Sequence, residues 1–188
     1  MTRFRTALIV LSLALTTGCT SAQGGMSALP TLAAGEYRLG AGDEIRVTVY
    51  GLDPMNNSYV VGDAGTISMP LIETIAVDGK TIPEVESAIA SAISARQLVA
   101  RAPSVSAQIQ KYRPFFIMGE VQRPGQYPYV PGLTVNSAVS IAGGYTFRAN
   151  TKAVVIKRKT KTGMVKGQTG PDGQVWPGDT IEVSESWF

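Results

Sequence analysis

A single cysteine limits how this chain can hold its fold, because 188 residues with one thiol cannot form an internal disulfide and must rely on packing. That cysteine, Cys19, follows a basic start, a short apolar run over residues 7–15 and three small residues. This pattern is typical of a secretory signal peptide, and the apolar run is well short of the roughly 20 residues that a membrane-spanning helix needs. We therefore predict that residues 1–18 are removed as a signal peptide.

The position of Cys19 directly after Gly18 resembles the bacterial lipobox, in which the thiol is acylated and becomes the first residue of the mature protein. Thr16 stands where the lipobox usually has leucine. The resemblance implies a covalent lipid such as palmitate on Cys19, and Thr20 after it favours sorting to the outer membrane. The alternative is an ordinary signal peptide cut nearby, which leaves Cys19 as a free thiol in the N-terminal tail.

The chain has no histidine, and this narrows the chemistry open to it. With Cys19 committed to lipid, a Cys/His zinc site and a histidine-dependent triad are excluded. The sequence has no phosphate-binding glycine loop, and its 14 acidic residues fall in no recognisable catalytic signature. Two carboxylates would suffice for glycoside hydrolysis, so that alternative stays open. We expect no catalytic residue, no metal and no cofactor apart from the lipid.

The charge of the chain gives no reason to expect nucleic acid as a partner. Without Arg3 and Arg5, which lie in the signal peptide, 15 basic residues stand against 14 acidic ones. A protein body so close to neutral lacks the basic excess of a nucleic-acid-binding surface.

Strand and turn patterns follow an uncharged segment, residues 19–34, which is typical of a flexible linker. Apolar and polar residues alternate over residues 44–50, directly after the turn Gly42-Asp43, and this period of two predicts a half-buried strand. Two apolar runs flank residues 62–65 and predict a β-hairpin. The strands predicted in this part cover residues 44–50, 59–61, 66–70, 71–77 and 105–110.

Two helices are predicted from their end signals. Thr81 and Glu84 stand three apart, as in a capping box, and apolar residues recur every four positions over residues 85–93. Thr134 begins the second helix, and the glycine pair at residues 143–144 ends it.

The second half of the chain repeats the pattern of strands around one helix. Its predicted strands are residues 115–118, expected to be buried, residues 153–158 and residues 180–183, with a turn at 161–163. Gly178-Asp179 stands before the last strand as Gly42-Asp43 stands before the first, which indicates one strand-entry turn used twice. We expect an α+β fold of two small mixed domains, residues 35–112 and 113–188, the second one β-grasp-like.

Five blocks of sequence occur in an order that carries a family resemblance: residues 37–43, 66–72, 118–121, 123–127 and 142–146. They read YRLGAGD, TISMPLI, MGEV, RPGQY and AGGYT, and they resemble motifs of the outer-membrane polysaccharide export family. Glu73 replaces a glycine that usually ends the second motif. The resemblance implies a polysaccharide export domain over residues 35–112 and a soluble-ligand-binding β-grasp domain over residues 113–188.

The same resemblance implies a non-enzymatic periplasmic lipoprotein that forms a homo-oligomeric ring and guides capsular or exopolysaccharide toward the cell surface. An inner-membrane polysaccharide co-polymerase is then an expected partner. Larger relatives add a C-terminal membrane helix, whereas this sequence ends at Phe188 directly after a strand. We therefore expect the short form, working with a separate outer-membrane channel protein. The alternative is a lipid-anchored periplasmic ligand-binding module that does not conduct polymer.

Candidate contacts to polymer or to a neighbouring subunit are charged and aromatic residues of the second half. Aromatic rings can stack on sugars and basic groups attract acidic polymer or lipid phosphate, but packing and simple solvation explain such residues equally well. The candidates are Glu120, Arg123, Tyr127, Tyr145, Lys157, Arg158 and Lys159.

Overall fold

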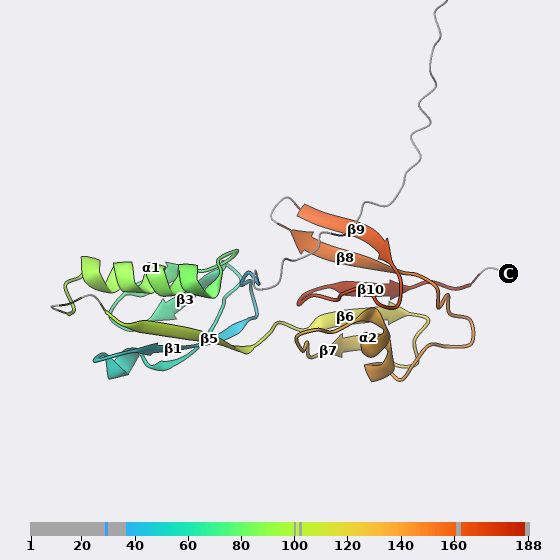
Figure 1. Cartoon of the computed structure of the whole chain (residues 1–188), viewed down its shortest axis with the longest axis horizontal. Helices are drawn as coiled ribbons and strands as arrows, with labels where there is room; N and C mark the ends of the chain where they lie inside the picture. Colours follow the sequence, from blue (N-terminus) through green and yellow to red (C-terminus); the bar gives the residue numbers. More distant parts are fainter. Residues whose placement is uncertain (1–28, 30–36, 100, 102, 161–162, 187–188) are drawn as a thin grey trace, which may run out of the picture.

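The computed structural model describes Leu29, Arg101 and residues 37–99, 103–160 and 163–186 (Figure 1). Their buried apolar side chains form two separate clusters, one within residues 39–107 and one within residues 115–183. Figure 1 shows the two units end to end. The α+β class expected from the sequence is confirmed. We refer to the units as the first and the second domain.

The first domain places one long helix on a three-stranded antiparallel sheet of order β2-β1-β5, and a separate pair of strands, β3 and β4, completes it (Figure 1). Its elements are β1 (Glu44–Val49), η1 (Asp53–Met55), β2 (Asn57–Val60), β3 (Thr66–Met69), β4 (Glu73–Ala76), α1 (Ile82–Ala95) and β5 (Val105–Lys111). Alternate residues of β1 are fully buried, which confirms the period of two.

Helix α1 begins where its capping box predicts. The backbone N–H of Thr81 donates to the Glu84 carboxylate at 2.7 Å, and the reciprocal bond of the box is also present. Val85, Ile89 and Ile93 are fully buried against the sheet. Burying each such side chain stabilises the fold by about 1.5–3 kcal/mol, so this face holds α1 in place.

The hairpin expected around residues 62–65 is wrong in its pairing. The turn itself forms, with the Gly62 N–H donating to the Thr66 carbonyl at 2.9 Å, but β2 pairs with β1 and β3 pairs with β4. The hairpin is instead β3–β4, whose turn holds Leu71 and Glu73 at positive φ, 69° and 66°. The sequence does not predict this turn because residues with a side chain rarely adopt that conformation.

The second domain packs one short helix against a five-stranded sheet of order β7-β6-β10-β8-β9, in which only β10 and β6 run parallel (Figure 1). Its elements are β6 (Phe115–Gly119), β7 (Gly125–Tyr127), α2 (Val135–Ile141), β8 (Val154–Thr160), β9 (Gly163–Thr169) and β10 (Thr180–Val183). The Ser137 N–H donates to the Thr134 hydroxyl at 3.3 Å, which confirms Thr134 as the cap of α2.

The expectation that β6 is wholly buried is wrong. Phe115 and Ile117 are buried under α2, but Phe116 and Met118 are 42% and 43% exposed. Only one face of this sheet is covered by a helix in the described chain, so alternate side chains of β6 point to solvent. The turn expected at residues 161–163 falls partly outside the described residues, although Thr160 and Gly163 pair across it.

Neither described helix has the length and hydrophobicity to cross a membrane. The signal peptide, Cys19 and nearly all of the linker lie outside the described residues. Leu29, near the end of that linker, packs against the core of the second domain.

Candidate functional site

The turn that enters β1 is built on a buried carboxylate. Asp43 has no exposed surface, and its oxygens accept hydrogen bonds from the Gly40 N–H at 2.8 Å, the Arg113 N–H at 2.8 Å and the Tyr37 hydroxyl at 2.7 Å. The Arg113 guanidinium adds an ion pair at 3.2 Å. A carboxylate out of water requires such partners. Asp43 therefore ties together its own turn, the entry to the first domain and the start of the second domain.

The turn that enters β10 repeats this device. Asp179 is also fully buried and accepts from the Trp176 N–H at 2.8 Å, again the amide three residues earlier. Its second partner is Arg158, whose guanidinium donates at 2.9 Å and 2.7 Å and lies 3.5 Å from the centre of the Trp176 ring. Burial raises the pKa of Asp179 above its ordinary value, and the ion pair with Arg158 opposes that rise. The predicted equivalence of the two turns is confirmed.

The expectation that Arg158 belongs to a basic surface is wrong. Arg158 is only 3% exposed because its side chain points into the second domain, where it neutralises Asp179. Strand alternation puts Arg158 on the opposite face of β8 from Lys157 and Lys159, a separation that a run of basic letters conceals.

Arg113 connects the two turns. Its Nη1 pairs with Asp43 at 3.2 Å, while its Nε donates to the Pro177 carbonyl at 3.0 Å, directly before Gly178. A Cβ atom at Gly40 would lie 1.9 Å from Nη1, and one at Gly178 would lie 2.8 Å from Nε. Both glycines thus leave room for the guanidinium. We call this junction the seam.

Tyrosine rings extend the seam. Tyr37 and Tyr112 meet edge to face with their ring centres 5.0 Å apart, and Tyr112 and Tyr129 do so at 5.4 Å. Such aromatic pairs contribute about 0.5–1.5 kcal/mol each beyond the area they bury. Burial raises the pKa of both Tyr37 and Tyr129, so both hydroxyls stay protonated at neutral pH. The sequence places Tyr37 and Tyr112 in the first domain and Tyr129 in the second, and it offers no signal that the three rings meet.

The candidates around residues 120–127 hold local loops. The Glu120 carboxylate accepts a hydrogen bond from the Thr146 hydroxyl, and Arg123 donates to the Ile141 carbonyl at 3.3 Å. The Tyr127 hydroxyl donates to the Arg123 carbonyl at 2.6 Å. Glu120 and Arg123 therefore each have a partner in their own domain and do not pair with one another within the described chain.

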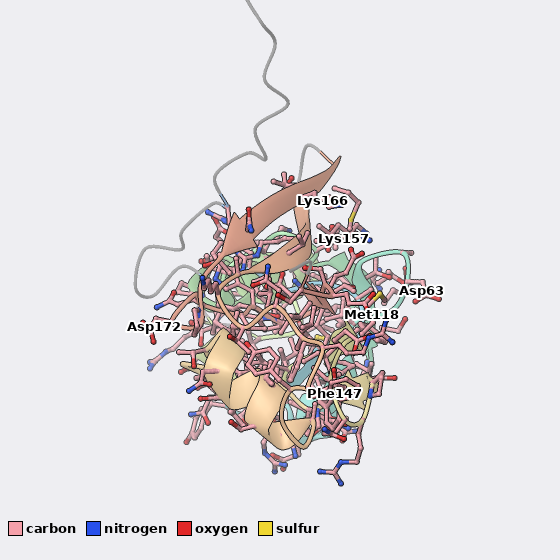
Figure 2. The ribbon with its side chains drawn as sticks, turned by 90° about the vertical axis from the view of Figure 1, so that its right-hand side faces the viewer. Asp63, Met118, Phe147, Lys157, Lys166 and Asp172 are labelled. Carbon is pink, nitrogen blue, oxygen red and sulfur yellow. The ribbon has the colours of Figure 1, made fainter. Side chains whose placement is uncertain are left out.

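The two aromatic candidates contribute to packing. The Tyr127 ring stacks on Phe115 with centres 5.9 Å apart. Tyr145 packs on the core of the second domain, where burial raises its pKa, and its hydroxyl has no hydrogen-bond partner among the described residues. Phe147, two residues on, is 95% exposed (Figure 2).

Lys157 and Lys159 lie on the face of the second-domain sheet opposite α2, which we call the outer face. Lys157 forms an ion pair with Glu182 of β10 at 2.9 Å, and Lys159 is exposed. Lys166 of β9 stands directly across from Lys157 (Figure 2). The pKa of Glu182 is lowered by its hydrogen bond to Lys157 and by the charges of Lys157 and Lys166. The sequence shows these lysines as a basic cluster around the turn at residues 161–163, but only the strand register shows which of them stand opposite one another on one face.

Comparison with known proteins gives matches for both domains. The polysaccharide biosynthesis/export protein family matches residues 32–110, and the SLBB domain family matches residues 114–172. The chain is 38% identical over 121 residues to the exopolysaccharide production protein ExoF of Rhizobium meliloti (strain 1021), a match that covers 59% of this chain. The chain spans 29% of that relative's length. The chain therefore consists of an export domain joined through Arg113 to an SLBB domain, and it belongs to the polysaccharide export protein family.

Proposed function

We propose that this chain is a component of capsular or exopolysaccharide export, and that its copies form a homo-oligomeric ring that guides polymer toward the cell surface. The observation that carries the proposal is that the two matched domains follow one another in the chain and are joined by the hydrogen bonds of Arg113 at the seam. A closed ring requires the same relation between the two domains in every copy. The bonds of Arg113 and the tyrosine contacts supply a joint suited to that requirement.

The proposal places the protein at the periplasmic face of the outer membrane, held by a lipid on Cys19. The signal-like start of the sequence supports this location. Polymer would come from an inner-membrane polysaccharide co-polymerase and leave through a separate outer-membrane channel protein. The chain would act by confinement and guidance rather than by catalysis, in keeping with its family and with a sequence that has no histidine.

Deletion of the gene in its host tests the proposal. We expect surface polymer to fall and cell-associated polymer to rise, with both restored by the wild-type gene and not by a Cys19→Ser variant. Sedimentation of the detergent-extracted protein is expected to show one defined oligomer. Normal surface polymer in a deletion strain that lacks a paralogue would contradict the proposal.

A second candidate function is a lipid-anchored module that binds a soluble ligand without conducting polymer. The outer face of the second-domain sheet, which no described helix covers, favours it, since a binding module needs an accessible surface and not a ring. The two functions differ in assembly: a stable monomer in mild detergent supports the binding module.

A further inference from the structure

One row of side chains crosses all five strands of the outer face. Lys166 of β9 stands opposite Lys157 of β8, which stands opposite Thr180 of β10. Thr180 in turn stands opposite Phe116 of β6, which stands opposite Gln126 of β7. Neighbouring strands are about 4.8 Å apart, so the row extends over about 19 Å. It presents two ammonium groups, a hydroxyl, an aromatic ring and an amide in sequence.

The basic end of the row holds like charges close together. Lys157 and Lys166 are direct cross-strand partners, and Lys159 follows two residues later on the same face of β8. Like charges directly opposite in a sheet are destabilising. Glu182 forms an ion pair with Lys157 at 2.9 Å, and its charge also acts on Lys166. Neither Lys159 nor Lys166 forms an ion pair of its own in the described chain, so the lysines are only partly neutralised. A bound anion would relieve the remaining repulsion.

The two domains differ in net charge, and the second domain, which carries the row, is the positive one. Residues 113–188 carry nine basic and five acidic residues, whereas residues 35–112 carry six basic and nine acidic ones. The hairpin formed by β8 and β9, residues 154–169, has five basic residues and no acidic one. The near-neutral total thus conceals a positive second domain, and a polyanion is attracted to it rather than to the first domain.

The groups beside the lysines fit a sugar polymer better than a protein or a lipid surface. Gln126 and Thr180 can exchange hydrogen bonds with sugar hydroxyls. Phe116, 42% exposed, offers its ring to the apolar side of a sugar, and Met118, two residues later on the same face of β6, extends this apolar patch. The long axis of the row suits an extended chain lying across the strands.

We propose that the outer face of the second-domain sheet binds an acidic polysaccharide, with Lys157, Lys159 and Lys166 contacting its anionic substituents and Phe116 a sugar ring. This inference rests on the proposed export function and names the class of polymer that the second domain accepts.

Calorimetric titration of the purified full chain with oligogalacturonate tests the proposal. The matched probe is the same oligomer with its carboxyl groups reduced to neutral alcohols. We expect the acidic oligomer to bind, its affinity to fall as salt rises, and the reduced oligomer to bind at least about tenfold more weakly, since two or three charge contacts are lost.

The variant is Lys159→Gln/Lys166→Gln, which leaves the Lys157–Glu182 pair in place. We expect about a tenfold loss of affinity for the acidic oligomer and a melting temperature about 2 °C higher, because cross-strand repulsion is removed. The control, Lys111→Gln/Lys152→Gln, makes the same change of charge at two exposed lysines outside the strands of the second-domain sheet, and should keep wild-type affinity.

Equal binding of acidic and reduced oligomers, or equal affinity of the two double variants, would overturn the inference. So would a variant that loses binding to anionic phospholipid vesicles but not to oligogalacturonate, or one whose only change is weaker self-association. These results bear on the outer face alone: a deletion strain that still loses its surface polymer would leave the export proposal standing.

Discussion

At the scale of single residues, the two buried aspartates differ from most charged residues of the chain because each replaces water with a complete set of partners. Asp179 illustrates this, since Arg158 and the Trp176 N–H saturate its carboxylate. Removing one member of a buried ion pair leaves an uncompensated charge in the interior, whereas replacing both members leaves no buried charge to stabilise.

We therefore predict that Arg158→Met costs about 3–5 kcal/mol of unfolding free energy and that Arg158→Met/Asp179→Asn costs less than the single variant. Asparagine keeps an oxygen for the Trp176 N–H, so the turn survives. Urea unfolding checks both values. Lys157→Met, next to Arg158 but on the outer face, serves as the control and should change stability by no more than about 1 kcal/mol. A double variant less stable than the single variant would contradict the argument.

At the scale of elements, Glu182 of β10 couples the middle of the second-domain sheet to β8. Its pKa is lowered by the Lys157 hydrogen bond and by the charges of Lys157 and Lys166. A carboxyl whose folded pKa is below its unfolded pKa stabilises the protein fully above the unfolded pKa, and that stabilisation is lost as pH falls through the folded pKa.

In the Lys157→Met variant we predict that the pKa of Glu182 returns toward its ordinary value. The variant should also lose less stability than the wild type when the pH is lowered through the acidic range. NMR titration of the Glu182 carboxyl carbon measures the first effect, and urea unfolding at a series of pH values measures the second. A Glu182 pKa unchanged in the variant would show that Lys157 is not its partner in solution.

Elements with strong local signals could be predicted from sequence, and elements defined by distant partners could not. The capping box of α1 and the Thr134 cap of α2 act within one turn of chain, so both helices were predictable. Strands β7 and β9 were not predictable, because neither has a regular alternation of apolar and polar residues: β7 reads GQY and β9 reads GMVKGQT.

The candidate site shows the same division. The paired Gly-Asp turns were predictable because each aspartate binds an amide three residues away. Their arginine partners were not: Arg113 is 70 residues from Asp43, and Arg158 is 21 residues from Asp179. Arg158 was placed on the surface because a run of basic letters does not reveal which side chain points inward.

At the scale of the whole molecule, the seam couples the unfolding of two domains that have separate cores. Each domain has its own apolar cluster, so nothing in the cores obliges the domains to unfold together. The coupling between them rests on the bonds of Arg113 and on the tyrosine contacts.

We predict that Arg113→Ala separates one unfolding transition into two. Both tryptophans lie in residues 113–188, so fluorescence reports the second domain, while far-UV circular dichroism follows α1 of the first. The two curves should coincide for the wild type and diverge for the variant, with the first domain losing about 2–3 kcal/mol as Asp43 keeps its burial but loses its ion pair.

Gly40→Ala should have the same effect by displacing the guanidinium, since its Cβ would lie 1.9 Å from Nη1. Arg96→Ala, which removes an exposed pair with Glu73, is the matched control and should leave the curves coincident. Coincident curves in Arg113→Ala would mean that the domains are coupled elsewhere.

The place of β10 has a consequence for how the protein is made. β10 lies between β6 and β8, yet it is synthesised after both. During biosynthesis, while the chain emerges with its N-terminus first, β6 and β8 have no strand between them until residues 180–183 arrive. The sheet of the second domain therefore cannot be completed strand by strand as the chain emerges. A nonsense mutation before β10 would leave a complete first domain attached to an unfolded, aggregation-prone and protease-sensitive segment.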